Sequence, residues 1–426
     1  MLDNILASLY LLAWVLTLIL YQWKIRKTDG GTAIICSYIL YAIFSLFTLN
    51  DNMFNILYEP LKFLPFLFLF IMLMIALSPI IYFHFHQTKQ IEEPNTRIFT
   101  FISIIIIICS FLLIPTIIGN FGTGIIKLFT DSDAGQDAYT EQALEASDSG
   151  SAISNIPAIL FNALSDICIF LFFYYLTKGK KNILLIIALF FSLIINMLMP
   201  IMQGSRSNVI LALFTIIVGY MLFKQFFAKK INRLIQLTGT AFLIATALPI
   251  IAITISRFDN LGGGVGGFLN WYVGQANIYF NNHVFDTGGT RNGDRILNLP
   301  KRIIDPSTPK NYVERREKYH NLNIDDNLFT TFVGDFVIDF GIPVTIIIFI
   351  TFNTWAITQI KPRDGTVRAD QLLLLYFIEC ICMQGGMYLF PYSDTGNLKV
   401  LFFMLLYIYL RFHEKLLAKF PIKQTP

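Results

Sequence analysis

Long apolar runs, each close to twenty residues, follow one another along the whole chain. A membrane-spanning helix needs about 20 consecutive apolar residues to cross the hydrocarbon layer of a bilayer. We therefore expect an all-α, polytopic integral membrane protein with about eleven transmembrane helices in a single membrane domain, residues 1–426. The predicted spans are residues 5–22, 32–49, 61–83, 98–118, 156–176, 183–202, 208–223, 234–255, 336–358, 371–391 and 397–412.

The polar connections between these runs alternate in charge. One set is rich in Lys and Arg and contains "KIRK", "KGKK", "KQFFAKKINR", "KPRDGTVR" and the tail "RFHEKLLAKF". The other set has few basic residues in its short members, which include "NDNMFNILYEP", "QGSRS" and "SDTGN". Because short basic loops stay in the cytoplasm, the alternation predicts an N-terminus outside the membrane and a C-terminus inside it. The first run has its basic residues after it, which predicts a first span and not a cleaved leader.

Two connections on the predicted outer side are longer than ordinary loops. Residues 119–155 are strongly acidic, and we expect a solvated external loop there. Residues 256–328 mix glycine ("NLGGGVGGF"), aromatic residues ("NWYVGQANIYFNN") and charge ("RNGDR", "ERREK"). Loops of this length are usually functional or disordered, and the aromatic content argues against disorder. Residues 256–328 are therefore expected to form a long external loop that contributes to a functional site.

Composition supports the membrane assignment and limits the chemistry. The chain is 55% hydrophobic and 14% charged, whereas a soluble globular protein is about 25% charged. Its net charge of +4 lies in short clusters between spans, which does not indicate a nucleic-acid partner. All five cysteines fall within apolar runs, where thiols are more often packed side chains than disulfides or metal ligands. The sequence contains no Walker A, HExxH or GxSxG motif and no metal-ligand cluster, so we expect no cofactor and no metal.

Arginine residues on the outer side run against the charge trend and define a first candidate site. Arg206, in "QGSRSN", lies where a helix is expected to begin, and backbone N–H groups together with a guanidinium favour phosphate binding. Arg257 follows a span at the same face, and Arg291 and Arg295 lie in "TRNGDR". Such a group beside a membrane suits a lipid-linked phosphate or pyrophosphate. Contacts with lipid headgroups or with neighbouring carboxylates would explain Arg206 equally well.

Two carboxylates and one histidine lie next to the outer end of a late span. Asp335 and Asp339 are four residues apart and share one helical face, so we expect both to face the bundle interior, near arginine or a wet cavity. We take Asp335, Asp339 and His320 as catalytic candidates, with Asp335 or His320 as the general base for a hydroxyl group of a substrate. The alternatives are that the carboxylates are structural counter-ions of arginine and that His320 is an ordinary exposed histidine.

Three stretches of the sequence resemble a known family. They are "GSRS" at an external helix start, "YVGQANIYFNN" in the long outer segment, and "NLFTTFVGDFVIDFGIP" leading into a span. Together they are similar to the Wzy-type oligosaccharide repeat-unit (O-antigen) polymerases. The resemblance covers most of the chain in topology but only these stretches in sequence. It implies a GT-C-like glycosyltransferase of the bacterial inner (cytoplasmic) membrane, with its active site facing the periplasm and a role in lipopolysaccharide or other polysaccharide biosynthesis.

The resemblance also implies substrates, partners and residue roles. The substrates would be glycans on undecaprenyl pyrophosphate, and the growing chain would pass from one carrier to the repeat unit on another. Membrane lipids, a flippase and chain-length regulators would be the other partners. The arginines would neutralise the departing pyrophosphate. Tyr272 and Tyr279, in "NWYVGQANIYFNN", would stack on sugar rings, or else simply pack against the bundle.

Two other functions stay open at this point. An O-antigen ligase shares the architecture and also uses Arg and His in its outer loop, so that His320 fits it too. A flippase or other transporter of lipid-linked oligosaccharides would need charge along a path through the bundle. Only a few charged residues, such as Asp166 and Glu379, fall within the predicted spans. The concentration of charge at one face therefore favours the polymerase.

Overall fold

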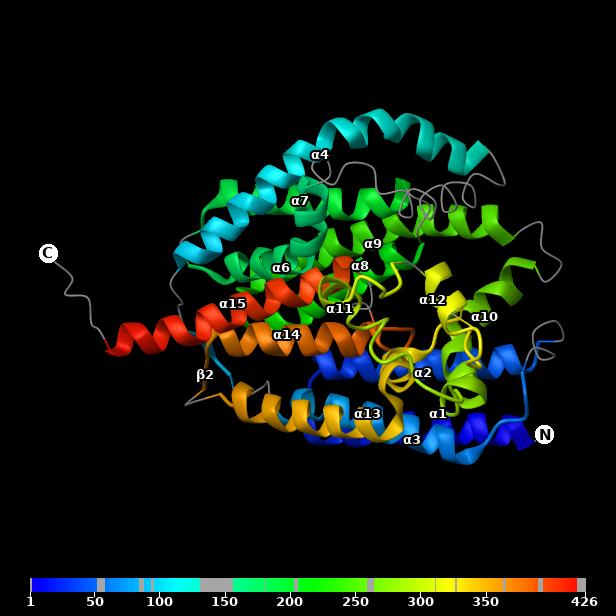
Figure 1. Ribbon diagram of the computed structural model, residues 1–426. Helices are drawn as coiled ribbons and strands as arrows, with labels where there is room; N and C mark the ends of the chain where they lie inside the picture. Colours follow the sequence, from blue (N-terminus) through cyan, green and yellow to red (C-terminus); the bar gives the residue numbers. More distant parts are fainter. Residues whose placement is uncertain are drawn as a thin grey trace, which may run out of the picture.

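A computed structural model describes residues 2–51, 58–83, 88–92, 96–130, 156–179, 181–202, 206–258, 264–310, 312–325, 328–362, 365–389 and 394–419. Within these ranges, ten helices are long and apolar enough to cross a membrane by length and composition. The prediction of an all-α, polytopic membrane protein is confirmed at this level. The long helices run side by side, and the start of the first helix (Leu2–Ile25) and the end of the last helix (Asp394–Lys419) lie at opposite ends of the bundle (Figure 1).

The elements fall into two groups by length. The helices with the length of a span are α1 (Leu2–Ile25), α2 (Gly30–Leu49), α3 (Phe63–Tyr82), α4 (Thr96–Thr130), α6 (Ile156–Thr177), α7 (Ile183–Met202), α8 (Arg206–Phe223), α9 (Lys229–Phe258), α13 (Thr331–Ile360) and α15 (Asp394–Lys419). The shorter elements are α10 (Gly264–Tyr279), α11 (Asn298–Ile304), α12 (Tyr312–Lys318), α14 (Ala369–Gln384) and the turns η3 (Lys224–Phe226) and η4 (Phe280–Val284). Two short strands, β1 (Gln90–Ile91) and β2 (Thr366–Val367), pair in parallel.

The predicted acidic loop begins later than the sequence suggested. Helix α4 continues through residue 119 as far as Thr130. The rest of the acidic stretch, residues 131–155, lies outside the described residues.

Helix α14 accounts for the difference between the eleven spans expected and the ten found. The tenth predicted span, residues 371–391, extends past α14, which ends at Gln384 and is followed by Gly385. From there the backbone turns to the start of α13, where Thr331 N donates to Met387 O at 2.8 Å. Non-helical backbone at membrane depth is tolerated only where protein or a polar cavity satisfies its hydrogen bonds. The end of α14 is therefore a place where a site can be built inside the bundle.

Helix α13 is also interrupted. Gly341 has φ 76° and ψ 165°, a backbone conformation that glycine adopts without steric cost. Pro343 follows at the start of the next helical stretch, where its missing N–H group is tolerated. Helix α13 consequently has a short first segment, which carries Asp335 and Asp339, and a long second segment.

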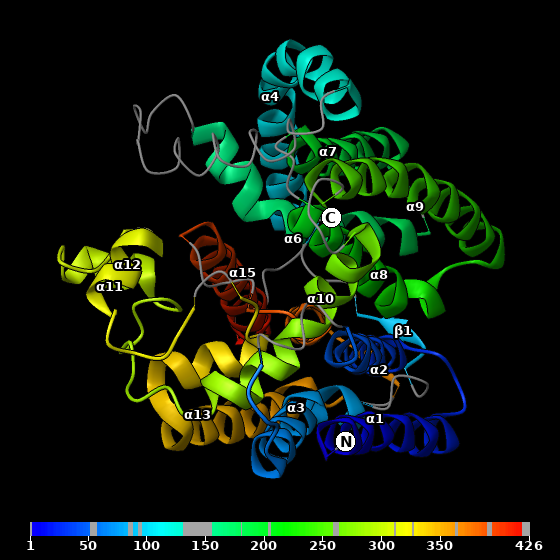
Figure 2. The ribbon, with the colours of Figure 1, turned by 90° about the vertical axis from the view of Figure 1, so that its right-hand side faces the viewer.

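The segment 256–328, predicted as a long external loop, is partly helical where it is described. Helix α10 packs so closely on α2 that a Cβ atom on Gly274 would lie 2.4 Å from the backbone of Phe44. Ser45 Oγ donates to Gly274 O at 2.7 Å across the same contact. A small residue at the contact allows the two backbones to approach. Figure 2 shows α11 and α12 together, beside α13 and α15.

Candidate functional site

A turn between η4 and α11 carries two of the predicted arginines. Asn292 and Gly293 have φ of 52° and 83°, so the chain reverses within "RNGDR". Arg291 N donates to Ile338 O at 3.0 Å, which fixes the turn against α13. The side chains of Arg291 and Arg295 are almost completely buried, with 1% and 4% of each residue exposed. The two guanidinium groups are thus held in the interior and do not project into solvent.

Asp335 and Asp339 face this turn from one side of α13, as their spacing predicted. Arg295 Nη2 lies 3.1 Å from Asp335 Oδ1. Asp339 Oδ2 accepts hydrogen bonds from the backbone N–H groups of Arg295 at 3.1 Å and Ile296 at 2.6 Å. Both carboxylates are fully buried. A buried charge needs both an ionic partner and hydrogen bonds. Asp335 has both, whereas Asp339 is held by backbone N–H groups.

The two carboxylates differ in how many of their oxygens already accept hydrogen bonds. Asp335 Oδ1 also accepts from Thr330 Oγ1 at 2.8 Å, and its Oδ2 accepts from Leu389 N at 2.5 Å, next to the end of α14. Both oxygens of Asp335 are therefore engaged, which makes it a counter-ion and positioning residue for Arg295. Asp339 Oδ1, by contrast, is buried without a hydrogen-bond partner among the residues that the structure covers. Asp339 is thus the carboxylate with an oxygen left for a ligand.

A third buried carboxylate, Asp294, was missed by the sequence analysis. It accepts hydrogen bonds from Lys318 Nζ at 2.7 Å and Tyr319 OH at 2.6 Å, and it pairs with Lys301. The guanidinium of Arg291 lies 6.0 Å from the centroid of the Tyr319 ring. The signal for Asp294 was its place between two arginines in "RNGDR". Its partners lie in α11, in α12 and directly after α12, and could not be read from that motif.

These side chains form one group, which we call the basic cluster. Its cationic members outnumber its carboxylates, because Arg291, Arg295, Lys301 and Lys318 stand against Asp294, Asp335 and Asp339. An excess of positive charge, here on three buried or half-buried side chains and the exposed Lys318, attracts an anion. The basic cluster is accordingly suited to a phosphate or diphosphate group.

The stability of the cluster should depend on the protonation of Asp294. Burial raises the pKa of this carboxyl. Hydrogen bonds from Lys301, Lys318 and Tyr319 together lower the pKa by more than burial raises it, so the net shift is downward. A carboxyl group with a lowered pKa in the folded state contributes its full stabilisation at pH values above the ordinary Asp pKa of about 3.9. That stabilisation is lost as the pH falls through the pKa of the folded state. We expect the melting temperature of the wild-type protein in detergent to fall more steeply below pH ~4 than that of the Asp294→Asn variant. Identical profiles for wild type and Asp294→Asn, with Asp286→Asn as the exposed control, would contradict this account.

An apolar cavity of about 470 Å³ adjoins the basic cluster, between α3, α11, α13, α14 and α15. Ile296 and Leu389 form part of its wall. The backbone N–H groups of these two residues donate to Asp339 and Asp335. The remaining wall is almost entirely apolar and includes Phe336. A ligand in the cavity would contact hydrocarbon along its length and reach the basic cluster at one end.

The cavity opens on a side of the bundle that a membrane would cover. Leu401 and Met404, on α15, line the cavity and are 48% and 54% exposed. Ile303, on α11, lines it from another side and is 77% exposed. Because α13 and α15 have the length and hydropathy of membrane spans, we expect this opening to face hydrocarbon. A lipid chain can therefore enter the cavity without crossing a polar barrier.

The other predicted arginines are placed only by their backbones. Arg206 begins α8, and Arg257 lies in the last turn of α9, but both side chains lie outside the described part of the structure. Gln384 Nε2, at the end of α14, donates to Leu211 O at 3.2 Å and Thr215 Oγ1 at 2.8 Å. The first turns of α8 consequently lie beside the broken end of α14, while phosphate binding by Arg206 and Arg257 stays a prediction.

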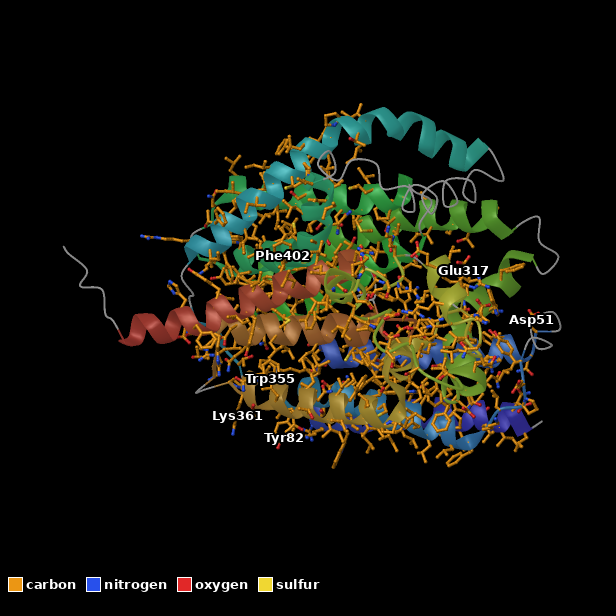
Figure 3. All side chains as sticks on the ribbon, in the orientation of Figure 1. Asp51, Tyr82, Glu317, Trp355, Lys361 and Phe402 are labelled. Carbon is orange, nitrogen blue, oxygen red and sulfur yellow. The ribbon has the colours of Figure 1, made fainter. Side chains whose placement is uncertain are left out.

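The predicted histidine and tyrosines are not gathered into the cluster. His320 is exposed, with Nδ1 2.9 Å from Glu317 O, and no contact in the described residues joins it to Asp335 or Asp339. In Figure 3, Glu317 marks the position of α12, while Lys361 lies toward the C-terminal end of the bundle. The general-base role of His320 stays a prediction, for a residue at the surface next to Tyr319, whose hydroxyl donates to Asp294.

Both predicted tyrosines take part in packing contacts within the chain. Tyr279 is 2% exposed, and its hydroxyl accepts a hydrogen bond from Asp325 N. Tyr272 is half-buried and packs edge-on against Phe329, with ring centroids 5.0 Å apart. The packing alternative fits both residues better than stacking on sugars in this arrangement. Over the described ranges, no group of three or more His, Cys, Asp and Glu side chains is placed to hold a metal ion.

Comparisons with models of protein families, with curated proteins and with solved structures give no match to this chain. Its function is accordingly inferred from the basic cluster, the adjoining cavity and the resemblance in the sequence.

Proposed function

We propose that the protein is a membrane glycosyltransferase that polymerises oligosaccharide repeat units carried on undecaprenyl pyrophosphate, at the outer leaflet of the bacterial inner membrane. One observation carries the proposal: a buried cluster with excess positive charge adjoins an apolar cavity that opens between membrane-spanning helices. A lipid-linked diphosphate has the matching parts, a hydrocarbon chain and an anionic head. The choice of carrier and of polymerisation follows the resemblance of "GSRS" and "NLFTTFVGDFVIDFGIP" to Wzy-type polymerases.

The proposed reaction needs a charge stabiliser and a proton acceptor. A hydroxyl oxygen of the acceptor sugar attacks the anomeric carbon of the donor, and the bond from that carbon to the pyrophosphate oxygen breaks. The electron pair of the broken bond leaves on the pyrophosphate, where cationic side chains such as Arg291 and Arg295 stabilise it. The hydroxyl proton goes to a base. Asp339 is better suited than Asp335 to that role, because its Oδ1 is not already engaged.

A flippase for lipid-linked oligosaccharides is the second candidate, because one observation favours it. Transporter sites are often built where helices are discontinuous, and α14 ends early while α13 breaks at Gly341. The ligase rests on His320 and on the resemblance alone, and no contact of His320 among the described residues adds to it.

The deciding experiment uses purified protein in proteoliposomes with synthetic undecaprenyl-pyrophosphate repeat units. We expect a ladder of longer glycans together with free undecaprenyl pyrophosphate, and neither product in protein-free liposomes. A parallel assay follows a fluorescent lipid-linked repeat unit from one leaflet to the other. Movement between leaflets without new glycosidic bonds would reject the polymerase and support the flippase.

A further inference from the structure

A second charged pair lies inside the bundle, at a different face of α15 from the cavity. Lys399 Nζ, on α15, lies 3.0 Å from Asp166 Oδ1, on α6. Helix α6 runs beside α15 in both ribbon views (Figures 1 and 2). Asn397 and Val400 of α15 line the cavity, whereas no residue of α6 does. Helix α15 therefore separates the cavity from the Asp166–Lys399 pair.

Only one of the two carboxylate oxygens of Asp166 has a hydrogen-bond partner among the described residues. Asp166 Oδ2 is buried and has no hydrogen-bond partner in the part of the chain that the structure describes. Tyr376 OH lies close by, but it donates to the backbone O of Asp166, at 3.0 Å, and not to the carboxylate. The side chain of Lys399 is 20% exposed, compared with 5% for Asp166. Lys399 is therefore the more accessible half of the pair.

Stability alone is a poor explanation for this pair. Apolar residues of similar volume often replace a buried ion pair with no loss of stability. Ionisable residues inside a membrane bundle usually mark a functional site for the same reason. The more exposed side chain of the pair, Lys399, ends in an ammonium group, so the ligand class that it would recognise is anionic.

We propose that Lys399 binds the phosphate of a second lipid-linked molecule, the acceptor, and that Asp166 holds the ammonium in position. This inference rests on the proposed polymerase function. Chain growth joins two molecules that each carry a lipid and a diphosphate. The reacting sugar of the acceptor lies at the opposite end of its repeat unit from its own carrier. The carrier of the acceptor therefore needs an anion site apart from the basic cluster, and the two faces of α15 provide that separation.

The first test compares two acceptors that have the same glycan, one lipid-linked and one water-soluble without phosphate. In the Lys399→Met variant we expect KM for the lipid-linked acceptor to rise about tenfold, the effect of losing one charge-assisted hydrogen bond. KM for the donor and the rate with the soluble acceptor should stay as in wild type. Equal impairment with both acceptors overturns the proposal.

The matched control removes both charges. Lys399→Met leaves Asp166 buried and unpaired, which by itself can destabilise the bundle. The double variant Asp166→Asn/Lys399→Met has no such defect and should melt like wild type. A purely structural pair predicts that the double variant recovers the wild-type KM for the lipid-linked acceptor. Our proposal predicts that this KM stays about tenfold raised.

Binding stoichiometry tests the site without relying on catalysis. Titration of the detergent-solubilised protein with undecaprenyl pyrophosphate, in excess phosphatidylglycerol, should show two sites per chain. The double variant at Asp166 and Lys399 should retain one. A single site in wild type, or two sites in the double variant, overturns the inference. Failure of wild type to form polymer, with two sites still present, would reject the polymerase and leave the second anion site intact.

Discussion

Replacing Arg295 with alanine should lower the rate of polymer formation by about 100-fold or more, because the basic cluster loses a cation that stabilises the departing pyrophosphate. The variant should also lose about 3–5 kcal/mol of stability, since Asp335 is left buried without its ionic partner. The two effects are separable. The double variant Arg295→Gln/Asp335→Asn has no unpaired charge at this contact and should recover most of the stability but little of the activity.

The measurements are the glycan ladder in proteoliposomes and the melting temperature in detergent. Arg302→Ala is the matched control, because Arg302 also lies in the segment before α13 but pairs with the partly exposed Asp394. Loss of that pair should cost no more than about 1 kcal/mol and leave polymer formation intact. A stable Arg295→Gln/Asp335→Asn protein that polymerises at the wild-type rate would remove Arg295 from the site.

Closing the cavity should have the second large effect. A tryptophan in place of Leu401 puts an indole ring at the opening, where the lipid chain of the donor would enter. We expect turnover of an undecaprenyl-linked donor to fall by about tenfold or more, while a donor with a short chain that does not need the cavity keeps its rate. The difference between the two donors separates blocked lipid binding from general damage.

Leu405→Trp supplies the control for this experiment. Leu405 lies one turn further along α15 and is 53% exposed, but it is not part of the cavity wall. Both tryptophan variants place the same large side chain on a lipid-facing surface. If Leu401→Trp and Leu405→Trp have the same effect on both donors, the cavity does not hold the lipid chain.

The spans could be predicted from the sequence because run length alone decides whether a helix can cross a membrane. Helix α14 shows the limit of that argument. Its apolar run continues past Gln384, so hydropathy indicated a full span. The pair Gly385 and Gly386 was the local signal for a break. The contacts that stabilise the break, from Thr331 of α13, come from a distant segment and leave no trace near α14.

In the candidate site, too, local spacing could be predicted from the sequence, whereas contacts between distant segments could not. A four-residue spacing places Asp335 and Asp339 on one face, and the structure has both facing the same turn. Which arginine they meet depends on where a turn between η4 and α11 folds back, and sequence spacing carries no such information. Tyr279 shows why local sequence could not decide between the two alternatives given for it. Its aromatic neighbourhood suggested a sugar-stacking surface, but whether a ring is covered is decided by the segment that packs over it, in this case the one with Asp325.

The hydrogen bonds between the "RNGDR" turn and α13 have a consequence for biosynthesis. The turn leaves the ribosome before α13 does, yet its backbone is held by Ile338 O and by the carboxylate of Asp339. Chains begin to fold from the N-terminus during synthesis, so the nascent turn must wait, with its arginines unburied, until α13 has been inserted. A chain that stops short of α13 would thus expose this charged segment as a ready target for quality-control proteases.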